Sequence, residues 1–309
     1  MKRFPPGNDK GSPVGEFEPD FFSVVRTLTE MSYFDRRVLA RRGGAAVTQD
    51  RFLYKYRAVD VSNKPSVLQL RDLIVLSKFW LSSVSDFNDP FDGSGNMIAE
   101  GTAGDKRTRI GKFFDLQGLS WSKKQKAIAK LATKPNSYFE AKVREYYRSY
   151  YARVGISCFA GDPRNVLMWS HYANKHTGIW LQFESARDPE TFAHTVGMTY
   201  SMDYPTVNWL KAKDFYEGFA IVMRQKAEGW RYEKETRIRK MEGAKTYIGF
   251  KPEALRAICF GCRSDASTKN AVMDLVKERT NRGLPSIRLY QAHQHETKYC
   301  LRIFRFVPG

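Results

Sequence analysis

The sequence is poor in cysteine, in acidic residues and in long apolar runs. Four cysteines in 309 residues are too few for a disulfide framework and favour a reducing, cytoplasmic compartment. The longest apolar stretch runs from Leu73 to Leu81 and contains Lys78, so it is shorter than the roughly 18 residues of a membrane helix. Residues 1–15 hold prolines where a signal peptide has its apolar segment. We therefore expect a cytoplasmic protein with no membrane partner.

Two nucleotide-binding motifs and a clear metal motif are also missing. No Gly-x-x-x-x-Gly-Lys-Ser/Thr is present, and the Gly-Ser-Gly at 93–95 lacks the third glycine of a dinucleotide fingerprint because Ile98 occupies its place. These absences disfavour P-loop ATPases and dinucleotide-binding dehydrogenases. The single Cys-x-x-Cys, formed by Cys259 and Cys262, lies in an apolar run and predicts buried thiols rather than zinc ligands. We predict no metal site.

The chain is rich in positive charge and in core-forming residues. Hydrophobic residues make up 42% and aromatic residues 14%, which predicts a folded protein. Basic residues outnumber acidic ones by 51 to 33, a net charge of +18 that favours polyanionic partners. Between residues 106 and 153, 13 basic residues stand against 3 acidic ones, a net +10. Tyrosines at near-helical spacing there predict helices, whose basic faces are either solvated or bind nucleic acid.

The predicted elements alternate between α and β without an internal repeat. We expect residues 1–16 to form a mobile N-terminus and residues 17–309 a single α+β domain with a basic helical insertion at about 106–153. The predicted helices are one after Asp20 and others at 67–76, 208–226 and 268–282. The predicted strands are 52–61, 79–83, 155–159, 178–183, 231–240, 257–260, 286–290 and 299–306.

Two early segments carry residues suited to binding. In the Tyr-Lys-Tyr-Arg at 54–57, strand alternation places Tyr56 and Arg57 on opposite faces. Arg57 then either anchors a phosphate or is a solvated cation on an edge strand. At 81–92 a strand enters an Asn-Asp-Pro turn, which is typical of a structural turn as well as of a site.

Two later segments carry candidate catalytic residues. Trp169, His171 and Tyr172 cluster before a predicted strand, a pattern typical either of a ligand pocket or of core packing. Glu233 and Glu235 would share one face of a strand with arginines on either side. Two carboxylates on one face are costly unless a function or the arginines hold them, and a solvated ladder of salt bridges is the alternative.

Taken together, these segments resemble a prokaryotic family of formerly uncharacterised domains that is often met beside mobile elements and defence genes. The resemblance runs from about Leu53 to Phe304, through YKYR, FNDPFD, MWSHYA-x-x-H-x-G, W-x-YE-x-E-x-R and the Phe-Gly-Cys-Arg at 260–263. The family gives no activity by itself, so the function has to come from the sites.

The sites are similar to those of ADP-ribosyltransferases, which place an arginine on the first strand, a serine on a middle strand and a Glu-x-Glu near the last motif. Here Arg57, Ser157 and the pair Glu233 and Glu235 match. The resemblance implies an ADP-ribosyltransferase-like mixed sheet core and NAD as a substrate. Other members of that superfamily use a histidine and a tyrosine in place of the arginine and the serine. His171 and Tyr172 provide such a pair here, although late in the chain.

The resemblance also implies a role for each residue. Glu235 would stabilise the positive charge that develops on the ribose as nicotinamide leaves, and Glu233 would act as general base on the accepting group. Arg57 would bind the pyrophosphate. The residues expected to bind NAD are Tyr56, Arg57, Ser83, Phe87, Asn88, Ser157 and Trp169, and those expected to be catalytic are Glu235, Glu233, His171 and Tyr172.

We therefore expect a NAD-dependent ADP-ribosyltransferase of a toxin or phage-defence kind. The basic segment at 106–153 favours nucleic acid as the acceptor, RNA before DNA, because a positive field strengthens association with a polyanion. An antitoxin protein covering the cleft is a further expected partner. Two alternatives stay open: a non-enzymatic defence protein that binds nucleic acid through its Tyr-rich basic helices, and a metal-dependent nuclease that uses His171, Glu233 and Glu235.

Overall fold

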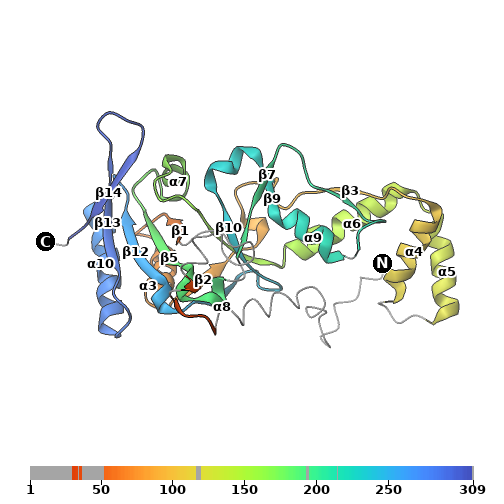
Figure 1. Ribbon diagram of the computed structural model, residues 1–309, viewed down its shortest axis with the longest axis horizontal. Helices are drawn as coiled ribbons and strands as arrows, with labels where there is room; N and C mark the ends of the chain where they lie inside the picture. Colours follow the sequence, from red (N-terminus) through yellow and green to blue (C-terminus); the bar gives the residue numbers. More distant parts are fainter. Residues whose placement is uncertain are drawn as a thin grey trace. The chain divides into compact units, whose positions relative to one another are not determined.

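The computed structural model describes residues 30–33, 35–36, 52–115, 120–192, 195–213 and 215–307. The predicted mobile segment 1–16 and the start of the predicted helix after Asp20 lie outside these residues. Two compact units divide the chain (Figure 1). The sheet unit comprises the chain up to Ser77, Met168–Thr195 and Gly249–Gly309, and the helical unit comprises Lys78–Leu167 and Val196–Ile248. The single domain expected over 17–309 stays a prediction.

The sheet unit is built on five strands in the order β1-β5-β12-β13-β14. These strands are β1 (Phe52–Arg57), β5 (Ile179–Glu184), β12 (Leu255–Phe260), β13 (Arg288–Gln294) and β14 (Leu301–Arg305). β12 and β13 run parallel, and the other neighbours pair antiparallel. β5 and β12 are buried along almost their whole length, which accounts for their nearly continuous apolar sequence.

From residue 52 onward, two long helices and several short ones pack with the strands of the sheet unit in the described part of the chain. The long ones are α3 (Lys64–Ile74) and α10 (Ala266–Asn281), and the short ones are α7 (Val166–Tyr172), α8 (Pro189–Phe192), η3 (Ser185–Arg187) and η5 (Pro252–Ala254). Asn63 and Asp265 cap the long helices by accepting hydrogen bonds from backbone N–H groups. The buried Arg279 of α10 donates to the carbonyl oxygen of Ile74 at 2.7 Å. This bond ties the end of α3 to α10.

The helical unit contains short strands in several small sheets. Its three-stranded sheet has the order β4-β10-β6, with β4 (Gly155–Phe159), β10 (Thr236–Lys240) and β6 (Thr195–Gly197). Two-stranded pairs join β2 (Lys78–Leu81) to β11 (Thr246–Gly249), β3 (Asn96–Ile98) to β8 (Thr206–Asn208), and β7 (Thr199–Ser201) to β9 (Gln225–Ala227). Two 3-10 turns, η2 (Val84–Asp86) and η4 (Glu228–Glu233), lie between strands.

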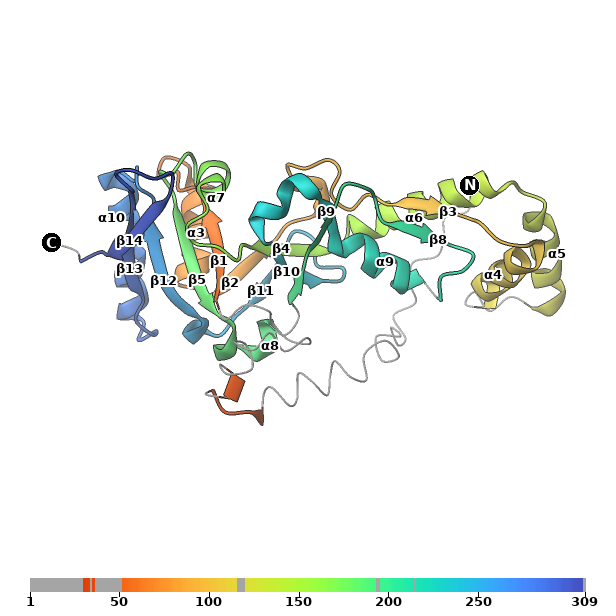
Figure 2. The same cartoon turned by 45° about the horizontal axis from the view of Figure 1, so that its top comes forward.

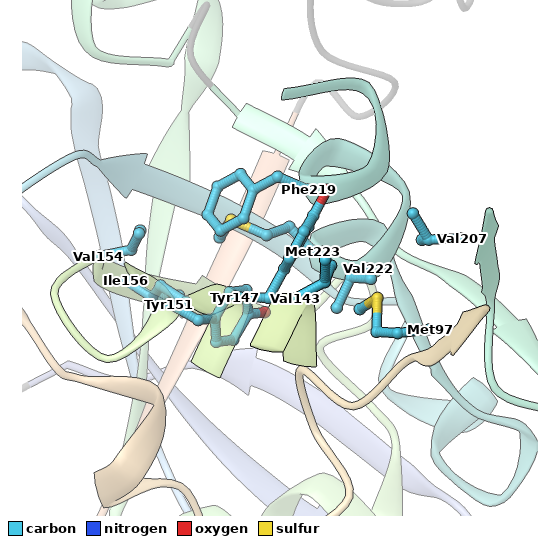
Figure 3. Close-up of a cluster of buried hydrophobic side chains, with 10 residues drawn as sticks. All are labelled: Met97, Val143, Tyr147, Tyr151, Val154, Ile156, Val207, Phe219, Val222 and Met223. Atoms are coloured by element: carbon cyan, nitrogen blue, oxygen red, sulfur yellow. The ribbon is translucent and has the colours of Figure 1, made fainter. Parts of the chain in front are cut away.

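The helices of this unit are α4 (Ala103–Asp115), α5 (Trp121–Ala132), α6 (Asn136–Tyr151) and α9 (Phe215–Arg224). α4 and α5 lie side by side in both ribbon views (Figures 1 and 2). α6 buries every fourth residue, namely Phe139, Val143, Tyr147 and Tyr151, as an amphipathic helix does. The last three of these pack with Met97, Val154, Ile156, Val207, Phe219, Val222 and Met223 (Figure 3).

The α+β class predicted from the sequence is confirmed. Three helices occupy 103–151, as the periodicity of the basic segment predicted. Two predicted elements were wrong in part. The strand expected at 231–240 begins only at Thr236, because η4 and a left-handed Lys234 precede it, and the helix expected at 208–226 begins only at Phe215, because β8 and a turn come first. No helix among the described residues is long and apolar enough to cross a membrane.

Candidate active site

Glu233 and Glu235 meet in the helical unit, but not by strand alternation. Glu233 ends the 3-10 turn η4, and Lys234 then adopts a left-handed conformation with φ 45°. This turn reverses the chain just before β10, so the two carboxylates point toward the same lysine. The expected flanking by two arginines holds for one side only, because Arg231 is exposed and pairs with Glu228.

Five buried charged side chains form what we call the carboxylate cluster: Asp92, Lys226, Glu233, Glu235 and Arg237. Lys226 Nζ lies 2.6 Å from Glu233 Oε2 and 2.9 Å from Glu235 Oε2. Arg237 Nε lies 2.7 Å from Glu235 Oε1, and its Nη1 donates to Asp92 Oδ1 at 2.9 Å. Each of the five residues exposes less than a tenth of its surface. The cluster is therefore a fully paired ionic network in a poorly hydrated environment.

Neighbouring aromatic residues hold the cluster in place. The Trp230 ring lies 4.9 Å from Lys226 Nζ, and the Phe87 ring lies 5.2 Å from the Arg237 guanidinium, both within the range of cation–π attraction. The backbone N–H of Glu235 donates to Tyr200 Oη at 2.7 Å. Phe87, expected to bind NAD, is thus next to the predicted catalytic carboxylates.

The environment fixes the charge of Glu235. Burial alone would raise its pKa, but attraction by Arg237 and Lys226, with hydrogen bonds from Arg237 and Cys158, lowers the pKa to about 2. Burial opposes the charge of Lys226 as well, yet Glu235 and Glu233 hold the pKa of Lys226 above its ordinary value. Glu235 is therefore an anion, and Lys226 a cation, at any physiological pH.

The cluster carries a net negative charge and faces an unused hydrogen-bond donor. Three carboxylates and two cations sum to −1. Tyr151 Oη is buried and has no hydrogen-bond partner among the described residues, and burial raises the pKa of this phenol. Gly93, with φ +73°, leaves the space that the Tyr151 ring fills. The Tyr151 ring therefore lies beside the residue that follows Asp92 in the chain.

The other predicted NAD-binding residues of the helical unit lie less directly at the cluster. Ser157 pairs with Ile238 across β4 and β10, whereas Cys158 pairs with Arg237; Cys158, not Ser157, therefore shares the face of Arg237. Ser83 is buried, and its hydroxyl donates to the Ala152 carbonyl at 2.8 Å and caps η2. Asn88 is exposed.

Two of the predicted residues of the sheet unit, Tyr56 and Trp169, pack against each other. Trp169 lies edge-on to Tyr56 with ring centroids 5.3 Å apart and is stacked on His176 at 6.3 Å. Gly261 is required here, because a Cβ at this position would meet the His176 carbonyl oxygen. Asn174, Lys175 and His176 are three consecutive left-handed residues. Much of the MWSHYA-x-x-H-x-G motif is thereby explained by packing.

Arg57 is the sheet-unit residue with the clearest capacity to bind an anion. It is half-buried, and its guanidinium donates to Gln69 Oε1. No carboxylate forms a salt bridge with it among the described residues, and burial lowers its pKa. His171 is exposed and lies edge-on to the half-buried Tyr172 with ring centroids 6.5 Å apart.

Sequence reasoning missed three members of this site, Asp92, Tyr151 and Lys226, and it expected Arg237 as a flanking cation only. Asp92 is the last residue of FNDPFD and Arg237 the last residue of W-x-YE-x-E-x-R. Both motifs therefore already included the residues that form the ion pair. Lys226 gave no signal, because it fell at the end of a predicted helix. Within the described residues no three His, Cys, Asp or Glu side chains gather as a metal site would require, and the four cysteines form no disulfide there.

The comparisons with known proteins add no relative. No family model, no curated protein and no solved structure matches the chain.

Proposed function

We propose that this chain is a NAD-dependent ADP-ribosyltransferase whose chemistry depends on Glu235 and Glu233. The observation that carries the proposal is the convergence of these two carboxylates on Lys226 inside a buried cluster of net charge −1. A buried fixed anion is suited to stabilise positive charge that appears only in a transition state.

The proposed transfer breaks the bond between the ribose C1′ of NAD and the nicotinamide nitrogen, which leaves with the electron pair. The anionic Glu235 would stabilise the positive charge that develops on the ribose, and Tyr151 Oη would donate to a ribose hydroxyl. Glu233 would accept the proton of the attacking amine or hydroxyl, whose oxygen or nitrogen then forms the new bond to C1′. Lys226 would keep the two carboxylates at a fixed separation.

The proposal extends to the acceptor and, separately, to an anion site within the sheet unit. There, a half-buried Arg57 without a carboxylate partner among the described residues supports binding of a phosphate. The net +10 between residues 106 and 153 supports a nucleic acid acceptor, with RNA proposed before DNA. A toxin or phage-defence role, an antitoxin partner and a cytoplasmic location belong to the same proposal.

The test incubates the purified full-length chain with NAD labelled in its adenylate phosphate, together with total cellular RNA, DNA and protein. We expect nicotinamide release and label on RNA. Glu235→Gln should lower turnover by about 100-fold or more, because the charge that acts in the transition state is lost. Label on protein alone would keep the enzyme and contradict the acceptor.

Glu228→Gln is the matched control, since it makes the same change at the start of η4, on a residue whose partner Arg231 is exposed. It should keep full turnover. Circular dichroism of both variants establishes that they are folded. A folded Glu235→Gln chain that turns over NAD as the wild type does, or a wild type that releases no nicotinamide, would overturn the proposal.

A further inference from the structure

Helix α6 carries a second row of residues beside its buried one. Tyr138, Lys142, Tyr146 and Tyr150 follow one another at intervals of four, and Arg153 comes just after the helix. Residues four apart lie on one side of a helix, so these five form a continuous line that we call the tyrosine stripe. The 12 positions from Tyr138 to Tyr150 span about 18 Å at the rise of an α-helix.

The tyrosine stripe combines stacked rings with cations that lie against them. Tyr146 is stacked on Tyr150 with ring centroids 6.3 Å apart and planes at 21°. The Arg153 guanidinium lies 4.9 Å from the Tyr150 ring, and Lys134 Nζ lies 5.8 Å from the Tyr138 ring. Tyr138 and Tyr146 expose 36% and 38% of their surface, so their rings are partly accessible from solution.

Two phenols of the stripe, Tyr146 and Tyr150, carry no charge near neutral pH. Burial raises the pKa of Tyr146, and burial together with Tyr216 raises the pKa of Tyr150. Both remain protonated where nucleic acids are studied, and neither repels a phosphate.

Among the described residues, Glu145 and Glu242 pair with cations of the stripe, and both carboxylates are exposed. Lys142 pairs with Glu145 at 2.7 Å and Arg153 with Glu242 at 2.8 Å. Exposed ion pairs contribute little net stability, so a phosphate can replace either carboxylate. The surrounding charge favours this exchange, because α5 carries four lysines and no acidic residue.

We propose that the tyrosine stripe binds single-stranded nucleic acid, with bases stacked on Tyr138 and Tyr146 and phosphates at Lys134, Lys142 and Arg153. Neutral rings flanked by cations at regular spacing are the chemistry that binds single strands without sequence preference. A duplex, whose bases are already stacked on each other, cannot use the rings. The inference rests on the proposed function in one respect only, namely that the bound strand is the acceptor of ADP-ribose.

The test measures fluorescence anisotropy of a labelled 15-nucleotide oligo(U) with the full-length chain, without NAD, at 50 and 200 mM salt. Tyr146→Ala should weaken binding by about tenfold, and Tyr146→Phe should bind as the wild type does, because the ring is kept. Lys142→Ala should make binding less dependent on salt. Oligo(dT) should bind within a few-fold of oligo(U), since stacking and phosphate contacts do not involve the sugar.

Tyr299→Ala, which removes a fully exposed tyrosine of the sheet unit, is the matched control and should bind normally. Glu235→Gln should also bind RNA normally, so loss of NAD turnover and loss of RNA binding are separate results. The proposal is overturned if the wild type binds no single strand at 50 mM salt, if Tyr146→Ala binds as tightly as the wild type, or if a duplex of the same length binds as tightly as the single strand.

Discussion

The carboxylate cluster and the basic helices α4 to α6 use charge in opposite ways. In the cluster, five charges are buried and each one is paired directly with a charge of the opposite sign, which fixes its position. On α5 and α6, most cations are exposed and act on a partner through a field that salt screens over about 8 Å at physiological ionic strength. Buried charge determines local structure and reactivity, whereas exposed charge determines which partners approach.

The largest expected effect follows from removing the cation at the centre of the cluster. Arg237→Ala leaves Asp92 and Glu235 buried without their partner, which should lower the free energy of unfolding by about 3–5 kcal/mol. Urea denaturation measures this loss. Arg144→Ala removes an exposed arginine of α6 and should leave the urea midpoint nearly unchanged. Equal losses in the two variants would contradict the difference between the regions.

Acid should weaken the cluster next. The pKa of Glu235 is lowered to about 2 in the folded chain, below its ordinary value, so its contribution is complete above the unfolded pKa and is lost as pH falls from about 4.5 toward 2. The loss should amount to about 3 kcal/mol, measured by urea denaturation at a series of pH values. In Glu235→Gln this part of the acid dependence should be missing, and an unchanged acid profile in that variant would show that other groups cause it.

The smallest effect is expected at an exposed pair. The pair Lys142 and Glu145 on α6 is accessible to solvent on both sides, so Lys142→Ala should keep the thermal midpoint within about 1 °C of the wild type. Differential scanning fluorimetry at 50 and 500 mM salt measures it. A thermal midpoint lowered as far as that of Arg237→Ala would mean that the stability of the helix depends on its surface charge.

Sequence periodicity predicted the elements that have a regular pattern. The apolar run of β5, the alternation of β1 and the four-residue spacing of α6 each gave the right element. The same method failed between Arg231 and Glu235, where alternating polar and aromatic residues imitate a strand. A turn with one left-handed residue leaves no periodic trace, and only tertiary contacts selected it.

The candidate site was predicted in part for a related reason. The letters of FNDPFD and W-x-YE-x-E-x-R indicated two segments with polar residues at fixed spacing, but not that Asp92 would pair with Arg237, 145 positions away. Lys226 was missed because a lysine is ordinarily an exposed residue. Its burial depends on the two carboxylates that accept from it, and such a partnership exists only in the folded chain.

The left-handed Lys234 restricts the position between the two glutamates of the motif. Glycine, asparagine and aspartate adopt a positive φ readily. Valine, isoleucine and threonine adopt it poorly, because their branched Cβ clashes with the backbone. The residue type between the two glutamates is therefore restricted. A substitution of Lys234 that disfavours positive φ would change the turn itself. A chain can therefore lose the convergence of Glu233 and Glu235 while both glutamates remain in its sequence.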